Sequence, residues 1–185
     1  PDEIVDYLQS GRNDKAGVAG EMTSVVKNST SHMTDADLQA IAAYLKFLGG
    51  NPPLQAYDQQ KNQATTAKLT AAVDLTEGQT LYLNNCGACH FVNGLGAARA
   101  FPQLDQASVV NAKDPQGLIH IILQGAQLPA TEKSPSMLKM PGFGHRLSDD
   151  QVAKLATFVR QGWSNDASAV TADQVKKVRE GLEQH

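Results

Sequence analysis

The segment NNCGACHFVNG, residues 84–94, contains both cysteines of the chain and one of its five histidines. Cys86 and Cys89 are three residues apart, and His90 follows directly. Three chemistries use cysteines at this spacing: a structural zinc site, a redox-active dithiol and the covalent attachment of a c-type haem. The residues around the motif distinguish among them.

A structural zinc site takes four ligands, usually from a second cysteine pair or a histidine pair. The chain has no further cysteine, and His120 and His145 are not spaced as such a pair. A redox dithiol usually opens a helix after a strand, whereas the residues before Cys86, TEGQTLYLNN, have a helical pattern. The sequence therefore favours haem attachment, with thioether bonds from Cys86 and Cys89 and one axial ligand from His90.

A methionine thioether is expected at the sixth iron position, where it raises the potential and closes the iron to other ligands. Met140 is the best candidate of the four methionines, because the Pro-Gly pair after it allows its loop to fold tightly over a haem. Phe143 is available to pack on the ring. His145 is the alternative ligand, and Met137 is expected to be a packing residue.

Helical patterns surround the motif, and no segment is a convincing strand, so residues 74–165 are predicted to form an all-α haem domain. Pairs of residues typical of helix starts are Thr76 with Gln79, Asp114 with Pro115, and Ser148 with Gln151. Apolar residues follow each pair at helical spacing.

The segments that flank this domain differ in character. Residues 51–73 are rich in Pro, Gln, Thr and Ala, with little apolar periodicity, and are predicted to be a linker. The tail, residues 166–185, has a helical stripe of Val175, Val178 and Leu182. Such a stripe predicts a helix that either packs on the domain or docks on a partner.

The first fifty residues repeat the second half of the predicted haem domain at a constant offset of 114 residues. The matched positions are Pro1 with Pro115, Ile4 with Leu118, Val5 with Ile119, Leu8 with Ile122, Gly11 with Gly125, Thr34 with Ser148, Leu38 with Val152, Ile41 with Leu155, Ala42 with Ala156, and Leu45 with Val159. Residues 1–50 are therefore expected to be the C-terminal half of another haem domain, whose CxxCH would precede residue 1.

Within this half-domain, Met22 corresponds to Met140 after a shift of four residues. We therefore predict that Met22 is the ligand of the haem that the upstream motif would hold, with His32 as the alternative. Met33 is expected to lie in the core. Without its haem the half-domain is expected to expose an apolar face.

Composition excludes several other classes of protein. The net charge of −3 gives no sign of nucleic-acid binding, which needs a clustered basic face. No apolar run approaches the roughly 20 residues that span a bilayer. The chain starts with proline and has no secretion signal, so we expect a mature product or a fragment.

On these motifs the chain resembles the multihaem cytochrome c subunits of bacterial membrane-bound dehydrogenases, which oxidise alcohols, aldehydes, gluconate and sorbitol. The segments that carry the resemblance are YLQSGRNDKAGVAGEM (7–22), STSHMTDADLQAIAAYLKFL (29–48), the CGACH motif, FPQL (101–104) and MPGFGHRLSDDQVAKLATFVRQGW (140–163). The resemblance implies class I cytochrome c folds, namely the end of a second haem domain followed by a complete third.

The same resemblance implies roles for individual residues. Met22 and Met140 would be the sixth ligands of their respective haems. The carbonyl of Pro102 would accept a hydrogen bond from Nδ1–H of His90 and fix the ring. Arg99 would reach a haem propionate, unless it is a solvated surface residue.

The implied function is electron transfer through one haem c with His/Met ligation. Electrons would pass from a periplasmic dehydrogenase subunit to ubiquinone or another cytochrome, at the membrane surface. The catalytic subunit would be a separate chain, so this chain is not expected to be an enzyme. The alternatives are a free-standing dihaem carrier and a haem enzyme or sensor with a displaceable sixth ligand.

Overall fold

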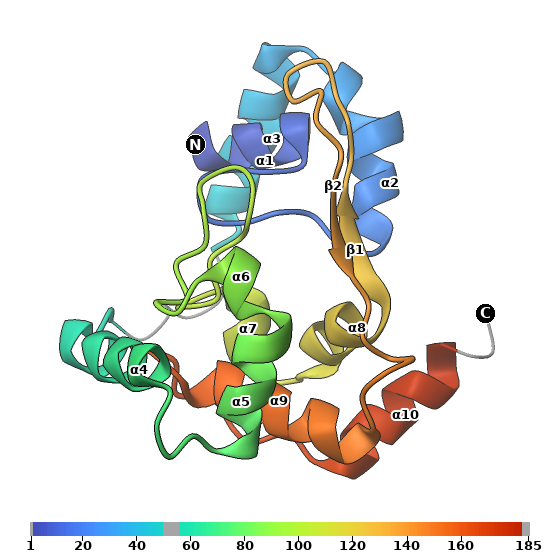
Figure 1. Ribbon diagram of the computed structural model, residues 1–185. Coiled ribbons are helices and arrows are strands. Elements are labelled where there is room, and N and C mark those ends of the chain that lie inside the picture. Colours follow the sequence, from blue (N-terminus) through green and yellow to red (C-terminus); the bar gives the residue numbers. More distant parts are fainter. Residues whose placement is uncertain (1, 50–55, 183–185) are drawn as a thin grey trace. The chain divides into compact units, whose positions relative to one another are not determined.

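The computed structural model describes residues 2–49 and 56–182, which divide into two compact units (Figure 1). The first unit comprises the described residues within 1–53, 97–102 and 126–140. The second comprises those within 54–96, 103–125 and 141–185. Residues 1, 50–55 and 183–185 lie outside this description. They include Pro1 of the predicted repeat and residues 51–55 of the predicted linker.

The chain is mainly helical, as predicted. The first unit contains α1 (Asp2–Ser10), α2 (Glu21–Asn28), the 3-10 helix η1 (Thr30–His32) and α3 (Asp35–Phe47). The second contains α4 (Gln59–Ala71), α5 (Glu77–Asn85), α6 (Gly87–His90), α7 (Ser108–Asn111), α8 (Gln116–Gln124), α9 (Asp149–Gln161) and α10 (Ala172–Leu182).

A small two-stranded sheet corrects the expectation that the domain has no strand. The strands are β1 (Gly125–Leu128) and β2 (Leu138–Pro141), which pair with each other. Each has four residues, which is too short for an alternating apolar pattern to stand out in the sequence.

The predicted linker contains a helix that belongs to the second unit. Residues 59–71 form α4, whose start is capped by Asp58, since its side chain accepts a hydrogen bond from the backbone N–H of Lys61 at 3.0 Å. Leu69 and Asn62 are buried. Sequence periodicity does not reveal this helix because one of its two buried side chains is polar.

The helix starts predicted at Thr76 and Ser148 are confirmed, whereas α8 begins at Gln116, one residue after the predicted first position at Pro115. Thr76 with Gln79, and Ser148 with Gln151, form reciprocal capping boxes at the starts of α5 and α9. The side chain of Asp114 accepts a hydrogen bond from the N–H of Gln116 at 2.9 Å. These contacts satisfy backbone donors that have no partner within the helix.

The tail forms the predicted helix, α10, which packs on α8 and α9. Val175 is buried in this packing, and Val178 is half-buried. Within the second unit, the stripe on α10 is therefore at least partly a packing surface.

The core of the second unit is centred on the pair formed by α5 and α9, which lie side by side in Figure 1. Tyr82, Phe158 and Trp163 pack with ring centroids 5.1–5.3 Å apart. A Cβ on Gly78 would lie 2.4 Å from the carbonyl oxygen of Lys154, so only glycine allows the two helices to approach this closely.

The first unit has a smaller core. Its buried apolar cluster consists of Val18, Val26 and Leu128, against which Tyr7, Met22 and Leu138 pack. The buried guanidinium of Arg12 donates hydrogen bonds to the carbonyls of Pro129 and Ser136. Burial, followed by the charge of Arg99, lowers the pKa of Arg12.

The internal repeat is visible in the bounds of the helices. Adding 114 to the bounds of α1 yields those of α8, and adding it to the bounds of α3 yields those of α9. Gly11 and Gly125 follow the first helix of each pair, with φ of +75° and +82°. The described residues up to 47 therefore contain two helices at the same spacing as α8 and α9, and their assignment to half of a haem domain stays a prediction.

The loops inside the two copies differ. Met22 lies in helix α2, whereas Met140 lies in strand β2. Pro129 and Pro135 interrupt the second loop, whereas the corresponding stretch of the first copy, GEMTSVVKN, contains no proline and continues as a helix. No helix in the described part of the chain is long and apolar enough to cross a membrane.

Candidate cofactor-attachment site

Cys86 stands at the junction of two helices. It ends α5, where its N–H donates to the carbonyl of Tyr82 at 2.8 Å, and it also precedes the single turn of α6. Its carbonyl accepts hydrogen bonds from the N–H groups of Cys89 at 3.1 Å and His90 at 2.9 Å. One helical turn therefore carries both thiols and the imidazole.

The two cysteines are free thiols in different surroundings, since Cys86 is buried and Cys89 is exposed. Burial, followed by the charge of Cys89, raises the pKa of Cys86 to about 12. Reactive cysteines of redox dithiols have lowered pKa values, so this environment does not favour a dithiol. Among the residues that the structure describes, no three His, Cys, Asp or Glu side chains gather as a metal site.

Three side chains that the sequence did not single out hold the loop after His90. The pairs are Tyr82 Oη with the carbonyl of Phe91, Trp163 Nε1 with that of Val92, and Asn62 Nδ2 with that of Asn93. Burial raises the pKa of Tyr82, with a smaller contribution from Cys86. The available sequence signal was the pair of aromatic residues with a polar tip, whose buried N–H or O–H needs an acceptor.

The other predicted haem contacts are distributed between the units. Met140, Pro102 and Arg99 belong to the first unit, while Phe143 belongs to the second and is buried. The side chain of Arg99 is partly exposed and forms an ion pair with Asp6 at 3.1 Å. The roles of all four toward a haem stay predictions.

The exposure of the remaining methionines and of the two alternative histidine ligands can be compared directly with the predictions. Met137 is 62% exposed and Met33 is 38% exposed, so both expectations that they are packing residues were wrong. Met137 accepts a hydrogen bond at its sulfur from Nε2 of Gln127 at 2.8 Å, a contact at an exposed site and not in a core. The alternative ligands His145 and His32 are exposed. Met22 packs against the apolar cluster of the first unit, and its role as a ligand stays a prediction.

The comparison with protein families decides the nature of the motif. A model of the family described as cytochrome c matches residues 75–163, which include Cys86, Cys89, His90 and Met140. Residues 75–163 belong to the cytochrome c family. This cytochrome c domain implies haem c as its cofactor, in agreement with the sequence analysis.

Similar proteins carry related names. The chain is 41% identical over 179 residues to the "alcohol dehydrogenase (quinone), cytochrome c subunit" of Gluconobacter oxydans, covering 96% of this chain and 37% of that protein. It is 39% identical over 180 residues to the "gluconate 2-dehydrogenase cytochrome c subunit" of Pantoea cypripedii, covering 96% and 41%.

A more distant relative, the "fructose dehydrogenase cytochrome subunit" of Gluconobacter japonicus, is 29% identical over 203 residues, covering 98% of this chain and 40% of that protein. The chain thus spans about two fifths of the length of these relatives.

The donor set at the site fits haem c. Covalent attachment needs two cysteines that are not joined to each other, and Cys86 and Cys89 are both free thiols. One axial ligand of such a site is the histidine that follows the second cysteine, and His90 lies at the end of the same helical turn.

Proposed function

We propose that this chain transfers electrons through a single covalently bound haem c with His90 and Met140 as axial ligands. The observation that carries the proposal is the turn α6, which presents two free thiols and one imidazole inside a cytochrome c domain. Bound haem c supplies one-electron exchange between ferric and ferrous iron.

The protein groups in this site bind and orient; none of them needs to move a proton. Cys86 and Cys89 anchor the cofactor through thioether bonds, and His90 supplies one axial nitrogen. Met140 supplies the other axial ligand, a thioether that raises the potential and keeps exogenous ligands away. The buried aromatic core around Tyr82 excludes water from one side of the site.

We further propose a dehydrogenase subunit as the electron donor and a quinone or another cytochrome as the acceptor. Support comes from the relatives, which are named as cytochrome c subunits of quinone-linked alcohol dehydrogenase and of gluconate and fructose dehydrogenases. The substrate would then be oxidised on a separate chain. The proposed location is the periplasm, at the membrane surface, because haem c is attached outside the cytoplasm.

The ligation is tested by replacing methionines one at a time. In the ferric protein, Met140→Leu is expected to abolish the weak long-wavelength absorption band of a methionine–iron bond and to allow carbon monoxide to bind after reduction. Met137→Leu is the matched control, because its side chain is 62% exposed in the same segment, and it should leave both properties unchanged.

A wild-type protein that lacks the methionine band and binds carbon monoxide would overturn the proposed ligation and favour a haem enzyme or sensor. The proposed partners are tested separately by capture from periplasmic extract. Co-purification of a flavin or quinone-cofactor dehydrogenase subunit supports the relay, whereas an isolated chain supports a free-standing carrier.

A further inference from the structure

We propose that Asn62, on helix α4, is a positioning residue for the attachment loop, residues 91–96, and that it acts on His90 through this loop. The inference rests on the proposed function because it takes His90 as an axial ligand. All the groups that carry it belong to the second unit. Helix α4, which the sequence analysis assigned to a linker, would then help to hold the haem-attachment loop.

Three successive carbonyls after His90 accept hydrogen bonds from side chains on three separate segments. The bonds are Tyr82 Oη to Phe91 O at 2.6 Å, Trp163 Nε1 to Val92 O at 2.9 Å, and Asn62 Nδ2 to Asn93 O at 3.0 Å. The donors come from α5, from the segment after α9, and from α4. No two neighbouring peptides of the loop are therefore held by the same element.

Backbone hydrogen bonds close the loop on both sides of this triplet. The carbonyl of His90 accepts from the N–H of Gly96 at 3.2 Å. The carbonyl of Gly94 accepts from the N–H groups of Leu104 at 2.8 Å and Asp105 at 3.1 Å. Every carbonyl from residue 90 to residue 94 has a donor, so rotating any of these peptides breaks a hydrogen bond.

Asn62 also links the loop to a buried carboxylate. Its Nδ2 donates to Oδ2 of Asp105 at 2.7 Å, and both residues are buried. The same carboxylate accepts hydrogen bonds from the N–H of Ser164 at 2.9 Å and from its hydroxyl at 3.2 Å. Removing the amide of Asn62 therefore deprives two acceptors of a donor at once, the buried carboxylate of Asp105 and the half-buried carbonyl of Asn93.

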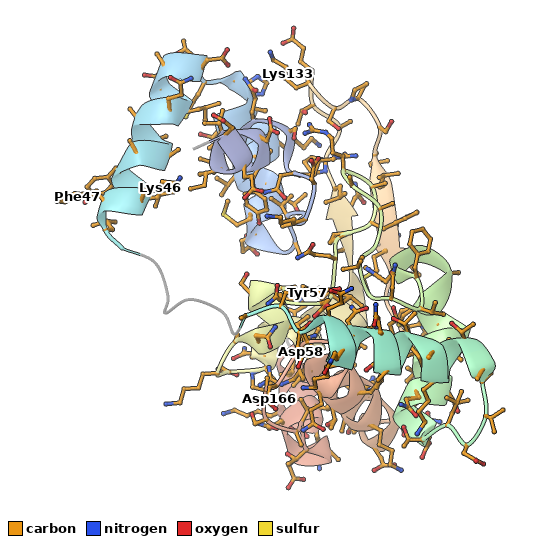
Figure 2. The ribbon with its side chains drawn as sticks, turned by 90° about the vertical axis from the view of Figure 1, so that its left-hand side faces the viewer. Lys46, Phe47, Tyr57, Asp58, Lys133 and Asp166 are labelled. Carbon is orange, nitrogen blue, oxygen red and sulfur yellow. The ribbon has the colours of Figure 1, made fainter. Side chains whose placement is uncertain are left out.

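Helix α4 is itself anchored next to this network. The N–H of Asp58, at the start of α4 in Figure 2, donates to the hydroxyl of Ser164 at 3.0 Å. Further along, the hydroxyl of Thr65 accepts from the N–H of Trp163 at 3.1 Å. Asn62 lies between these two anchors, so its amide is held at a fixed place relative to the loop.

The expected consequence is electronic as well as structural. Groups around an axial histidine fix its ring and tune the metal, and solvent access near the iron lowers the potential by favouring the more highly charged ferric state. A loop that loses the bond at Asn93 opens more often and admits water beside His90. The midpoint potential should then fall.

The test compares Asn62→Leu with Gln63→Leu in the haem-loaded protein. Gln63 is the exposed neighbour on the same helix, so the control makes the same chemical change outside the network. Asn62→Leu should lower the midpoint potential in a redox titration and speed amide hydrogen exchange of residues 91–96 severalfold. Gln63→Leu should leave both at wild-type values.

A lower unfolding midpoint for Asn62→Leu, with unchanged potential and unchanged exchange of the loop, would make the residue merely structural and overturn the proposal. If this variant does not accumulate, Asn62→Ser replaces it, with a smaller shift expected in the same direction; wild-type values there overturn the proposal equally. A wild-type chain without haem would defeat the proposed function instead, and the exchange data would still test the loop.

Discussion

Helices α3 and α9 have the same length and bounds 114 residues apart, but the C-terminal part of the apolar stripe is buried only on α9, whereas on α3 burial is confined to Leu38 and Ala42. On α9, Phe158 packs edge-on against Tyr82 of α5, and Val159 is buried. The matching positions on α3 are Tyr44, which is 60% exposed, and Leu45, which is 44% exposed. One turn further, Phe47 is 84% exposed and projects from the end of α3 in Figure 2.

The two helices differ in the segment that packs on them, and not in their own apolar pattern. In the second unit α5 packs on α9 through Gly78, while the described residues of the first unit include no helix that precedes α1 and corresponds to α5. An apolar stripe therefore specifies a helix in both copies, but burial of the stripe depends on a second segment. We propose that the exposed face of α3 is the one that an α5-like helix covers in a complete domain, as the repeat predicts.

The largest expected contrast between the copies is haem content. Replacing Cys86 and Cys89 together with alanine should remove all covalent haem, because the first unit has no cysteine of its own. Intact mass measures the loss directly. Met22→Leu should retain one covalent haem, and a second haem on the wild-type chain would contradict the comparison.

The next contrast concerns packing. Phe158→Ala should destabilise the second unit by about 2 kcal/mol, less than the truncation of a fully buried phenylalanine, because the ring packs on Tyr82 and Trp163 but is only half-buried. Tyr44→Ala, at the matching position, should change stability by no more than about 0.5 kcal/mol because its ring is mostly solvated. Peptide-resolved hydrogen exchange of α9 and α3 measures each effect separately. Equal losses would show that α3 is covered in solution.

A smaller effect is expected at the glycines that end α1 and α8. Both have positive φ, so alanine should cost about 1–2 kcal/mol at each. Gly11→Ala should cost more than the φ penalty alone, because a Cβ on Gly11 would lie 2.9 Å from the ring of Pro129. Exchange of the last turns of α1 and α8 reports the two losses, and unchanged exchange of α1 would count against this packing.

The smallest contrast is at the helix caps. Ser148→Ala should cost about 1 kcal/mol because Ser148 and Gln151 cap each other reciprocally. Thr34→Ala should cost less, since the side chain of Asp37 accepts from the hydroxyl of Thr34 and not from its backbone N–H. Chemical denaturation followed by exchange at α9 and α3 ranks them, with Ser148→Thr as the control that keeps the cap.

Local chemistry explains which features could be predicted from the sequence. Caps such as Thr76 and Ser148, and the glycine after α8, act on adjacent backbone groups, so short patterns reveal them. The CxxCH motif likewise lies on one turn. The repeat could be recognised because the apolar residues of the helices and the residues at the helix ends recur together at one offset, 114 residues.

The features that were missed depend on contacts between distant segments. Asn62 is polar, and its burial follows only from Asn93 and Asp105, which lie 31 and 43 residues away. The short strands β1 and β2 depend on each other for their hydrogen bonds. The exposure of Met137 and Met33 follows from how distant segments pack, which no local pattern encodes.

The position of Trp163 has a practical consequence. It is the single tryptophan of the chain, it is fully buried, and its indole N–H is bonded to the carbonyl of Val92. Tryptophan emission, excited selectively so that the four tyrosines do not contribute, therefore reports on the second unit, at the carbonyl two residues after His90. Quenching of that emission would follow the insertion of the cofactor over time, without any added label.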